Sequence, residues 1–379
     1  MLRVLLILML PGVFTASLHA QPAPDSTGAD ATLADSTLAA AYRVFRSDGQ
    51  DATLDDVLAA MHAVDVVYIG EQHDDPVAHY LQAELLTQTY ARQAQAANAR
   101  SMALSLEMFE RDVQLILDEY LADLITETHF LRSSRPWKNY KTDYRPMVEF
   151  AKAHGMPVLA ANAPRRYVNR VSRKGPASLD SLTVWGKSWL PPLPYPGPSP
   201  AYKAKWDRLM AEMMAPKKGE TPPADTTADT TVTHTPSPKT PNPEAQRADT
   251  IPTPNADTTA THAAAEEEKE APPSMHGPSY MLDAQALWDA TMAYSIYQHL
   301  LAVPGSLVLH VAGSFHVEGG LGTPAQLEGF RPGTRRLVIV VKAVDDFTAF
   351  DSEEHGHLGD FIIQTDKALP RSYEASFGQ

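Results

Sequence analysis

The sequence contains no cysteine among its 379 residues. The chain therefore forms no disulfide bond, offers no thiolate to a metal ion and has no cysteine that could carry a lipid. A covalent CxxCH attachment of haem is excluded for the same reason. An ordinary buried core must stabilise the fold, and roughly 200 to 250 residues with ordered patterning are enough for one such domain.

Long apolar segments are also scarce. In residues 1–20, Arg3 precedes an apolar run at 4–10, which is followed by the helix-breaking Pro11 and by small residues. This layout predicts a secretory signal peptide, because the run is shorter than the roughly 20 residues that span a bilayer. The alternative is a membrane-anchored or buried N-terminal helix. We expect an exported protein, periplasmic or secreted, without a lipid anchor and with Gln21 as the first mature residue.

The charge of the chain is strongly acidic, with a formal net value of −14 at pH 7. A negative chain is repelled by nucleic acid and by anionic membrane surfaces, so neither is expected as a partner. The simpler interpretation is that the acidic surface keeps an exported protein soluble.

Two segments lack the patterning of a folded core. Residues 21–35 are small and polar, and we expect a flexible leader. Residues 216–273 hold 11 of the 31 prolines, many Thr, Asp and Ala, and no aromatic residue. Such a composition buries too little apolar surface to offset the entropy of ordering, which predicts a disordered insertion. The remaining residues, 36–215 and 274–379, are predicted to form a single α/β domain.

Strand and helix signals alternate through this predicted domain. The strand signals are apolar, β-branched runs, as in strands that are buried on both faces. Asp75 followed by Pro76 marks the start of a helix. The pattern predicts a mainly parallel sheet with helices on both faces. The expected strands are 64–70, 102–109, 157–162, 306–313 and 336–344, and the expected helices include 113–124, 145–153 and 281–301.

Polar residues follow four of the five predicted strands. The carboxyl ends of parallel strands meet at one edge of a sheet, where ligands bind in open α/β folds. One further histidine lies a turn inside the helix that starts at Pro76, near its positive end. We therefore predict a shared polar site made of Glu71, His73, His79, Glu107, Asn162 and His316.

The chemistry of this polar site has more than one interpretation. Two buried carboxylates cannot both stay charged without partners, so they pair with histidines or arginines, share a proton or hold a cation. A structural network that braces the strand ends is one alternative. A Zn or Mn site is another, although the HExxH spacing is absent. The candidate metal ligands are His73, His79, His316, Glu71 and Glu107.

Five segments, taken in order, resemble the ChaN-like haem-binding family of bacterial export-pathway proteins. That family lies within a wider group that includes erythromycin-esterase-like and Tiki/TraB-like proteins. The matching segments contain the motifs YIGEQHDDPVAHY, LSLEMFERD, NYKTDYRPMVEF and VAGSFHVEGG. They fall within residues 68–86, 104–121, 135–166, 284–296 and 311–324.

The resemblance implies haem binding, a role in haem or iron acquisition, and a homodimer that encloses paired haems. It also implies a tyrosine as axial ligand, which suits ferric iron. The candidates for that ligand are Tyr80, Tyr140 and Tyr144. Basic candidates for the haem propionates are Arg145 and Arg165, with Arg135, Lys138 and Arg166 as further choices. Relatives are typically lipoproteins, and this chain departs from them because it has no cysteine.

The resulting expectation is an exported haem-binding protein rather than an enzyme. The alternative is a hydrolase, metal-dependent or based on His and Glu, in which one histidine is the general base and a glutamate orients it. A binding scaffold with a vestigial site is a third interpretation. The sequence has no GxSxG elbow and no GxGxxG phosphate loop that would favour other enzyme classes.

Overall fold

The computed structural model describes residues 35–214 and 280–373. The predicted signal peptide, the leader up to residue 34 and the predicted insertion 216–273 lie outside the described residues. No helix of the described part is long and apolar enough to cross a membrane.

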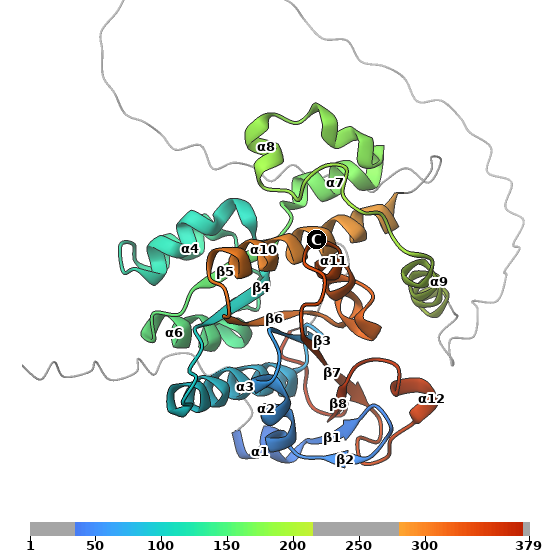
Figure 1. The fold of residues 1–379 in the computed structure, drawn as a ribbon. Coiled ribbons are helices and arrows are strands. Elements are labelled where there is room, and N and C mark those ends of the chain that lie inside the picture. Colours follow the sequence, from blue (N-terminus) through green and yellow to red (C-terminus); the bar gives the residue numbers. More distant parts are fainter. Residues whose placement is uncertain (1–34, 215–279, 374–379) are drawn as a thin grey trace, which may run out of the picture.

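An eight-stranded mixed sheet forms the centre of the molecule (Figure 1). Its strand order is β2-β1-β8-β7-β3-β6-β4-β5. The six strands from β8 to β5 are parallel, and β1 pairs antiparallel with both of its neighbours. The strands are β1 (Tyr42–Arg46), β2 (Asp51–Ala52), β3 (Val66–Glu71), β4 (Met102–Glu110), β5 (Val158–Asn162), β6 (Leu307–Gly313), β7 (Arg336–Val344) and β8 (Phe361–Asp366).

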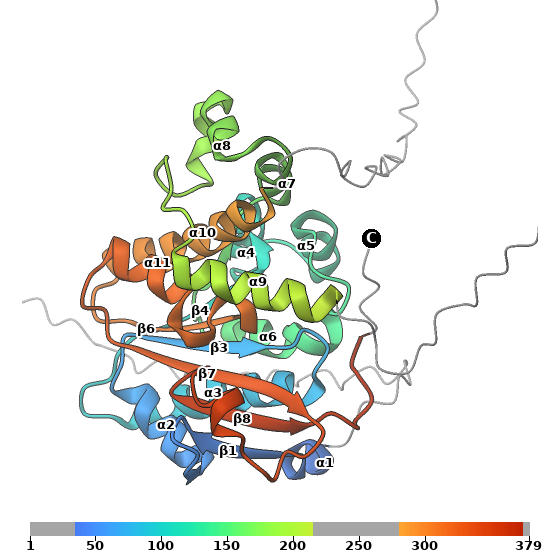
Figure 2. The ribbon, with the colours of Figure 1, turned by 90° about the vertical axis from the view of Figure 1, so that its right-hand side faces the viewer.

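Helices cover both faces of this sheet, as predicted (Figure 2). They are α1 (Asp35–Ala40), α2 (Leu54–His62), α3 (Pro76–Gln95), α4 (Gln114–Leu121), α5 (Glu127–Ser134), α6 (Arg145–Ala153), α7 (Arg165–Lys174), α8 (Val184–Ser188), α9 (Pro200–Met214), α10 (Met281–Ala302), α11 (Thr323–Phe330) and α12 (Ser352–His355). Between α5 and α6, residues Tyr140–Tyr144 form a π-helical turn, η2.

The alternation of side chains along each strand divides the core in two. In β3, Val67 and Ile69 belong to the core that α2, α3 and α6 cover. Val66 and Tyr68 point to the other face and pack with residues of α10 and α11. Every residue of β3 is buried, which explains why this strand is apolar in the sequence up to its last residue, Glu71.

The predicted start of α3 is confirmed in detail. The side chain of Asp75 accepts hydrogen bonds from the backbone N–H groups of Val77, at 2.9 Å, and Ala78, at 3.3 Å, with Pro76 at the first helical position. This cap satisfies donors that would otherwise be buried without partners. It also fixes the first turn of α3, and with it the place of His79.

The five predicted strands are present, and three more were not predicted. These are β1, β2 and β8, which together form one side of the sheet. The chain on both sides of the gap at 215–279 contributes to the same sheet, since β6 pairs with both β3 and β4. The helix predicted at 113–124 ends at Leu121, and Asp123 adopts a left-handed backbone with φ of 57°.

Candidate functional site

The parallel strands β3, β6, β4 and β5 bring their carboxyl ends to one edge of the sheet. Five of the six residues of the predicted polar site lie there in two neighbouring clusters. The first cluster is centred on Glu71 and contains His73 and His79. The second is centred on Glu107 and contains His316. Gly313, the last residue of β6, lies between the two clusters.

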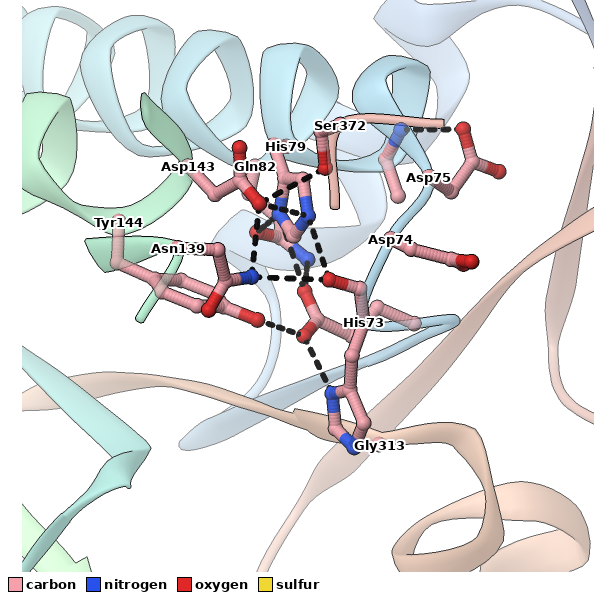
Figure 3. A network of polar contacts seen from close by, with 12 residues as sticks. His73, Asp74, Asp75, His79, Gln82, Asn139, Asp143, Tyr144, Gly313 and Ser372 are labelled. Atoms are coloured by element: carbon pink, nitrogen blue, oxygen red, sulfur yellow. Dashed lines mark hydrogen bonds and ion pairs between the residues drawn. The ribbon is translucent and has the colours of Figure 1, made fainter. Parts of the chain in front are cut away.

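Glu71 is the last residue of β3, and its side chain is fully buried. One carboxylate oxygen accepts hydrogen bonds from Nδ1 of His73, at 2.9 Å, and from the hydroxyl of Tyr144, at 2.6 Å. The other accepts from the side-chain amide of Gln82 (Figure 3). Burial raises the pKa of Glu71, but the charge of His79 and the hydrogen bonds from His73 and Tyr144 outweigh it and lower the pKa. The carboxylate therefore stays ionised inside the protein.

His79 lies between two buried carboxylates. Its Nδ1 is 3.4 Å from Glu71, and its Nε2 is 3.2 Å from Asp143. Burial lowers the pKa of His79, but Glu71 and Asp143 raise it to about 9. The side chain is thus a cation at neutral pH. Asp143 also accepts hydrogen bonds from Asn139, at 2.7 Å, and Ser372, at 2.8 Å, so each charge of this cluster is paired.

His73 is the member of the first cluster that reaches solvent, with 41% of its side chain exposed. Its Nδ1 is bound to Glu71, and its ring makes an edge-to-face contact with Trp137 at 4.7 Å between centroids. Burial lowers the pKa of His73, but the hydrogen bond that His73 donates to Glu71 and the charges of Glu107 and Glu71 outweigh burial and raise the pKa. The ring also rests against Gly313, where a Cβ atom would lie 2.8 Å from Cε1 and 2.9 Å from Nε2.

The second cluster is a chain of alternating carboxylates and imidazole. Glu107 lies where the pairing of β4 with β5 changes register, between Leu106 and Glu110, and such irregularities redirect side chains. One oxygen of Glu107 accepts a hydrogen bond from the backbone N–H of Gly313 at 2.7 Å, and the other is 3.7 Å from Nε2 of His316. The opposite nitrogen of His316 donates to Asp289 at 2.9 Å.

Asp289 anchors this second cluster to helices α9 and α11. It is 1% exposed and accepts hydrogen bonds from the hydroxyls of Thr323, at 2.9 Å, and Tyr202. Burial lowers the pKa of His316, but Asp289 and then Glu107 raise it above its ordinary value. The two carboxylates thus favour the protonated form of this imidazole.

Asn162 is not joined to either cluster. It ends β5 at the same sheet edge, but its side-chain oxygen accepts a hydrogen bond from the neighbouring backbone N–H of Ala163 at 2.8 Å. Its role in the structure is to fix the turn that leads into α7. The prediction that Asn162 lies at this sheet edge is therefore correct, but its side chain is not part of the site.

The candidate haem tyrosines lie in different environments. Tyr144 is buried and donates to Glu71, and burial with the charge of Glu71 raises its pKa. Tyr140 is buried among Phe109 and Phe130, and its hydroxyl has no hydrogen-bond partner within the described residues. Tyr80, on α3, is half-buried against the core.

The two candidate propionate-binding arginines are also apart from the clusters. Arg145 forms an ion pair with Glu127, with 2.5 Å between Nε and Oε1. Arg165 is exposed at the first position of α7.

Sequence reasoning missed several residues of the site, namely Asn139, Asp143, Tyr202, Asp289 and Ser372. Asp289 carried a usable signal, because it is an acidic residue at a buried position of the largely apolar helix α10. Asp143 lies between the two tyrosines of the NYKTDYRP motif and could have been included with them. Ser372 follows the last strand and carries no signal in the sequence.

The arrangement does not provide a cage for a metal ion. Within residues 35–214 and 280–373, no three His, Asp or Glu side chains are placed so that they could hold one. The reason lies in the hydrogen bonds, since Glu71 is occupied by His73, Tyr144 and Gln82 and Glu107 by the backbone of Gly313.

The sequence matches the family described as "Haem-binding uptake, Tiki superfamily, ChaN" over residues 57–327. This chain belongs to the ChaN family. The match spans more than half of the chain and includes both clusters of the site. No curated protein matches this chain.

Several solved structures are similar to this ChaN-family chain, and the one with a TM-score above 0.5 has the same fold. ChaN of Campylobacter jejuni, which binds haem cofacially, is 14% identical with a TM-score of 0.51, and the match covers 85% of this chain and 96% of that one. A Bacillus cereus protein is 11% identical with a TM-score of 0.41, covering 90% and 98%. An erythromycin esterase in its open conformation is 10% identical with a TM-score of 0.38, covering 80% and 77%.

Proposed function

We propose that this protein binds haem at the sheet edge beside His73 and takes part in haem or iron acquisition as an exported protein. Membership of the ChaN family is the observation that carries the proposal. The N-terminal residues 1–20, with the layout of a secretory signal peptide, support export. The cofacial haem binding of the Campylobacter jejuni relative supports a homodimer.

The donor set around His73 fits a haem iron. Metal-binding histidines commonly give one ring N–H to a carboxylate, which fixes the tautomer and makes the other nitrogen a better ligand. Glu71 holds Nδ1 of His73 in this way, and 41% of the side chain is open to solvent. Nε2 of His73 would hold the iron, and bound haem would supply a ferric centre that an imidazole can coordinate.

Apolar and basic groups suited to the rest of a haem lie next to this histidine. Trp137 makes its edge-to-face contact with His73 and offers an apolar wall. Lys138 follows Trp137 in the chain and is exposed. Arg371 donates to Asp74, the residue after His73, at 2.8 Å. These cations would pair with the two carboxylates of a haem.

The tyrosines fit the role of axial ligand less well in this conformation. Burial raises the pKa of both Tyr140 and Tyr144, whereas iron is bound by the deprotonated phenolate. Tyr144 instead acts through Glu71, whose carboxylate it helps to orient toward His73. Tyr80 is the one of the three candidates whose side chain is half-buried rather than buried, so it is the tyrosine to compare with His73.

Titration with haemin tests the proposal. We expect the mature protein, beginning at Gln21, to bind haemin stoichiometrically with a shifted Soret band. Light scattering coupled to size exclusion should show a dimer in the presence of haemin. A Soret band identical to that of free haemin at every protein concentration would contradict the proposal.

The second cluster supports a second candidate, a hydrolase based on histidine and carboxylates. The observation that favours it is the chain formed by Asp289, His316 and Glu107, since an imidazole that a carboxylate orients can serve in general acid–base catalysis. A screen of ester substrates tests this candidate, with Glu107→Gln as the comparison. The hydrolase would be excluded if the wild type hydrolysed no ester, or if Glu107→Gln hydrolysed the esters as fast as the wild type.

A further inference from the structure

Helices α7 and α8, with the short 3-10 helix Pro176–Ser181 between them, form a projecting lobe at residues 165–188 (Figures 1 and 2). The lobe contains six Lys and Arg residues and one Asp, which gives it a net charge of +5 in a chain whose net charge is −14. The charge of this protein is therefore segregated, and the acidity of the whole chain does not describe this part of it.

The basic side chains of α7 share the face that is turned away from the core. Val168 and Val171 are the buried residues of the helix and pack with residues of α10. Arg166, Arg170, Arg173 and Lys174 recur at three- and four-residue spacing, which places them on the side of the helix away from the two valines. The exposed ones are Arg165, Arg166, Arg173 and Lys174.

The lobe also exposes two large apolar side chains at the start of α8. Val184 is 85% exposed and Trp185 is 80% exposed. The turn that carries them is fixed, because the side chain of Thr183 caps α8 by accepting from the N–H of Gly186 at 3.1 Å. Gly186 in turn packs on Tyr167 of α7, whose hydroxyl would be 2.8 Å from a Cβ at that position. Trp185 is thus presented to solvent by a rigid turn.

We infer that this lobe docks on an anionic lipid surface. Tryptophan favours the interface between water and lipid, and exposed Lys and Arg are attracted to anionic headgroups. A projecting lobe with an apolar tip and a basic flank suits insertion into such an interface. The acidic remainder of the chain opposes this only weakly, because salt screens charges that are more than about 10 Å away.

This inference goes beyond haem binding and does not depend on it. It also revises the expectation, drawn from the total charge, that anionic membranes are excluded as partners. A basic and aromatic surface could instead bind an acidic protein or a nucleic acid. The projecting Val184 and Trp185, which lie on the same turn, favour the lipid surface because their exposed surface is mostly apolar.

Flotation of the mature protein, beginning at Gln21, with lipid vesicles tests the inference. We expect binding to vesicles that contain about a third phosphatidylglycerol, and binding weaker by at least about tenfold to vesicles of phosphatidylcholine alone. Trp185→Ser and the double variant Arg165→Gln with Lys174→Gln should each weaken binding at least about fivefold. Leu124→Ser is the matched control, because Leu124 is 73% exposed outside the lobe, and it should bind as the wild type does.

Equal binding to both kinds of vesicle, no binding to either, or wild-type binding by the lobe variants would overturn the inference. Binding of single-stranded DNA that depends on the lobe, without binding to vesicles, would overturn it in favour of a nucleic acid. Trp185→Ser should still bind haemin as the wild type does, which keeps this test separate from that of the haem site.

Discussion

The ring of His73 lies directly against Gly313, with Cε1 and Nε2 at 2.8 and 2.9 Å from where a Cβ of residue 313 would be. Glu107 holds this glycine in place through its hydrogen bond to the backbone N–H. The exposed histidine of the first cluster is therefore positioned by the buried carboxylate of the second. This contact makes the two clusters one site.

Gly313→Ala should displace the imidazole of His73 without unfolding the protein. The new methyl group meets the far end of a half-exposed side chain, which can rotate away. We expect haemin affinity to fall by about tenfold or more, with a small change in melting temperature. Gly329→Ala is the control, because a Cβ there contacts nothing within 4 Å. Unchanged haemin affinity of Gly313→Ala would argue against the position assigned to His73.

Tyr144 and Tyr140 form a natural pair for testing buried hydroxyl groups. Tyr144→Phe removes a donor from the ionised Glu71, and it should lower the free energy of unfolding by about 1–3 kcal/mol. Tyr140→Phe removes a buried hydroxyl that has no partner within the described residues, so stability should be unchanged or higher. Urea denaturation measures both. A larger loss for Tyr140→Phe than for Tyr144→Phe would contradict the hydrogen-bond assignment.

Asp289→Asn should destabilise the second cluster. The aspartate is buried and is the nearest counter-charge of His316, and breaking a buried ion pair costs about 3–5 kcal/mol. Denaturation at neutral pH measures the loss, and Asp180→Asn, on the exposed surface, is the control. Equal stability of the two variants would argue against the ion pair between Asp289 and His316.

His79 should make stability depend on pH above neutrality. Its pKa is raised from 6.5 to about 9, so the folded state holds the proton more tightly than the unfolded state. The stabilisation is complete below about pH 6.5 and is lost as the pH rises through 9, a difference of roughly 3 kcal/mol. His79→Gln should lack this decline between pH 6.5 and 9, whereas His129→Gln, a change of an exposed histidine, should keep it. If the free energy of unfolding depended on pH in the same way in the wild type and in His79→Gln, the ion pairs of His79 with Glu71 and Asp143 would be refuted.

The parallel part of the sheet could be predicted because its strands are buried on both faces. Runs such as 66–71 and 307–313 are buried throughout and mostly apolar, so local sequence alone marks them. The missed strands differ. In β1, Arg43 and Arg46 interrupt the pattern at positions that are exposed or half-buried, and β2 has only two residues.

The candidate site was predictable where a strand end delivers a polar residue, and not where tertiary packing supplies one. Glu71 and Glu107 lie at or near the carboxyl ends of strands, His73 and His316 follow strands, and the structure brings them together. Asp289 and Tyr202 come from helices α10 and α9, which are distant in the sequence from the strand ends. Asn162 shows the limit of the rule, because its side chain is used locally.

Loss and rescue of the axial imidazole tests the central claim most directly. We predict that His73→Ala lowers haemin affinity by about tenfold or more and changes the Soret band. Added imidazole should restore the wild-type spectrum, and His129→Ala should behave as the wild type. Haemin binding by His73→Ala with wild-type affinity and spectrum would contradict the assignment of the haem site to His73.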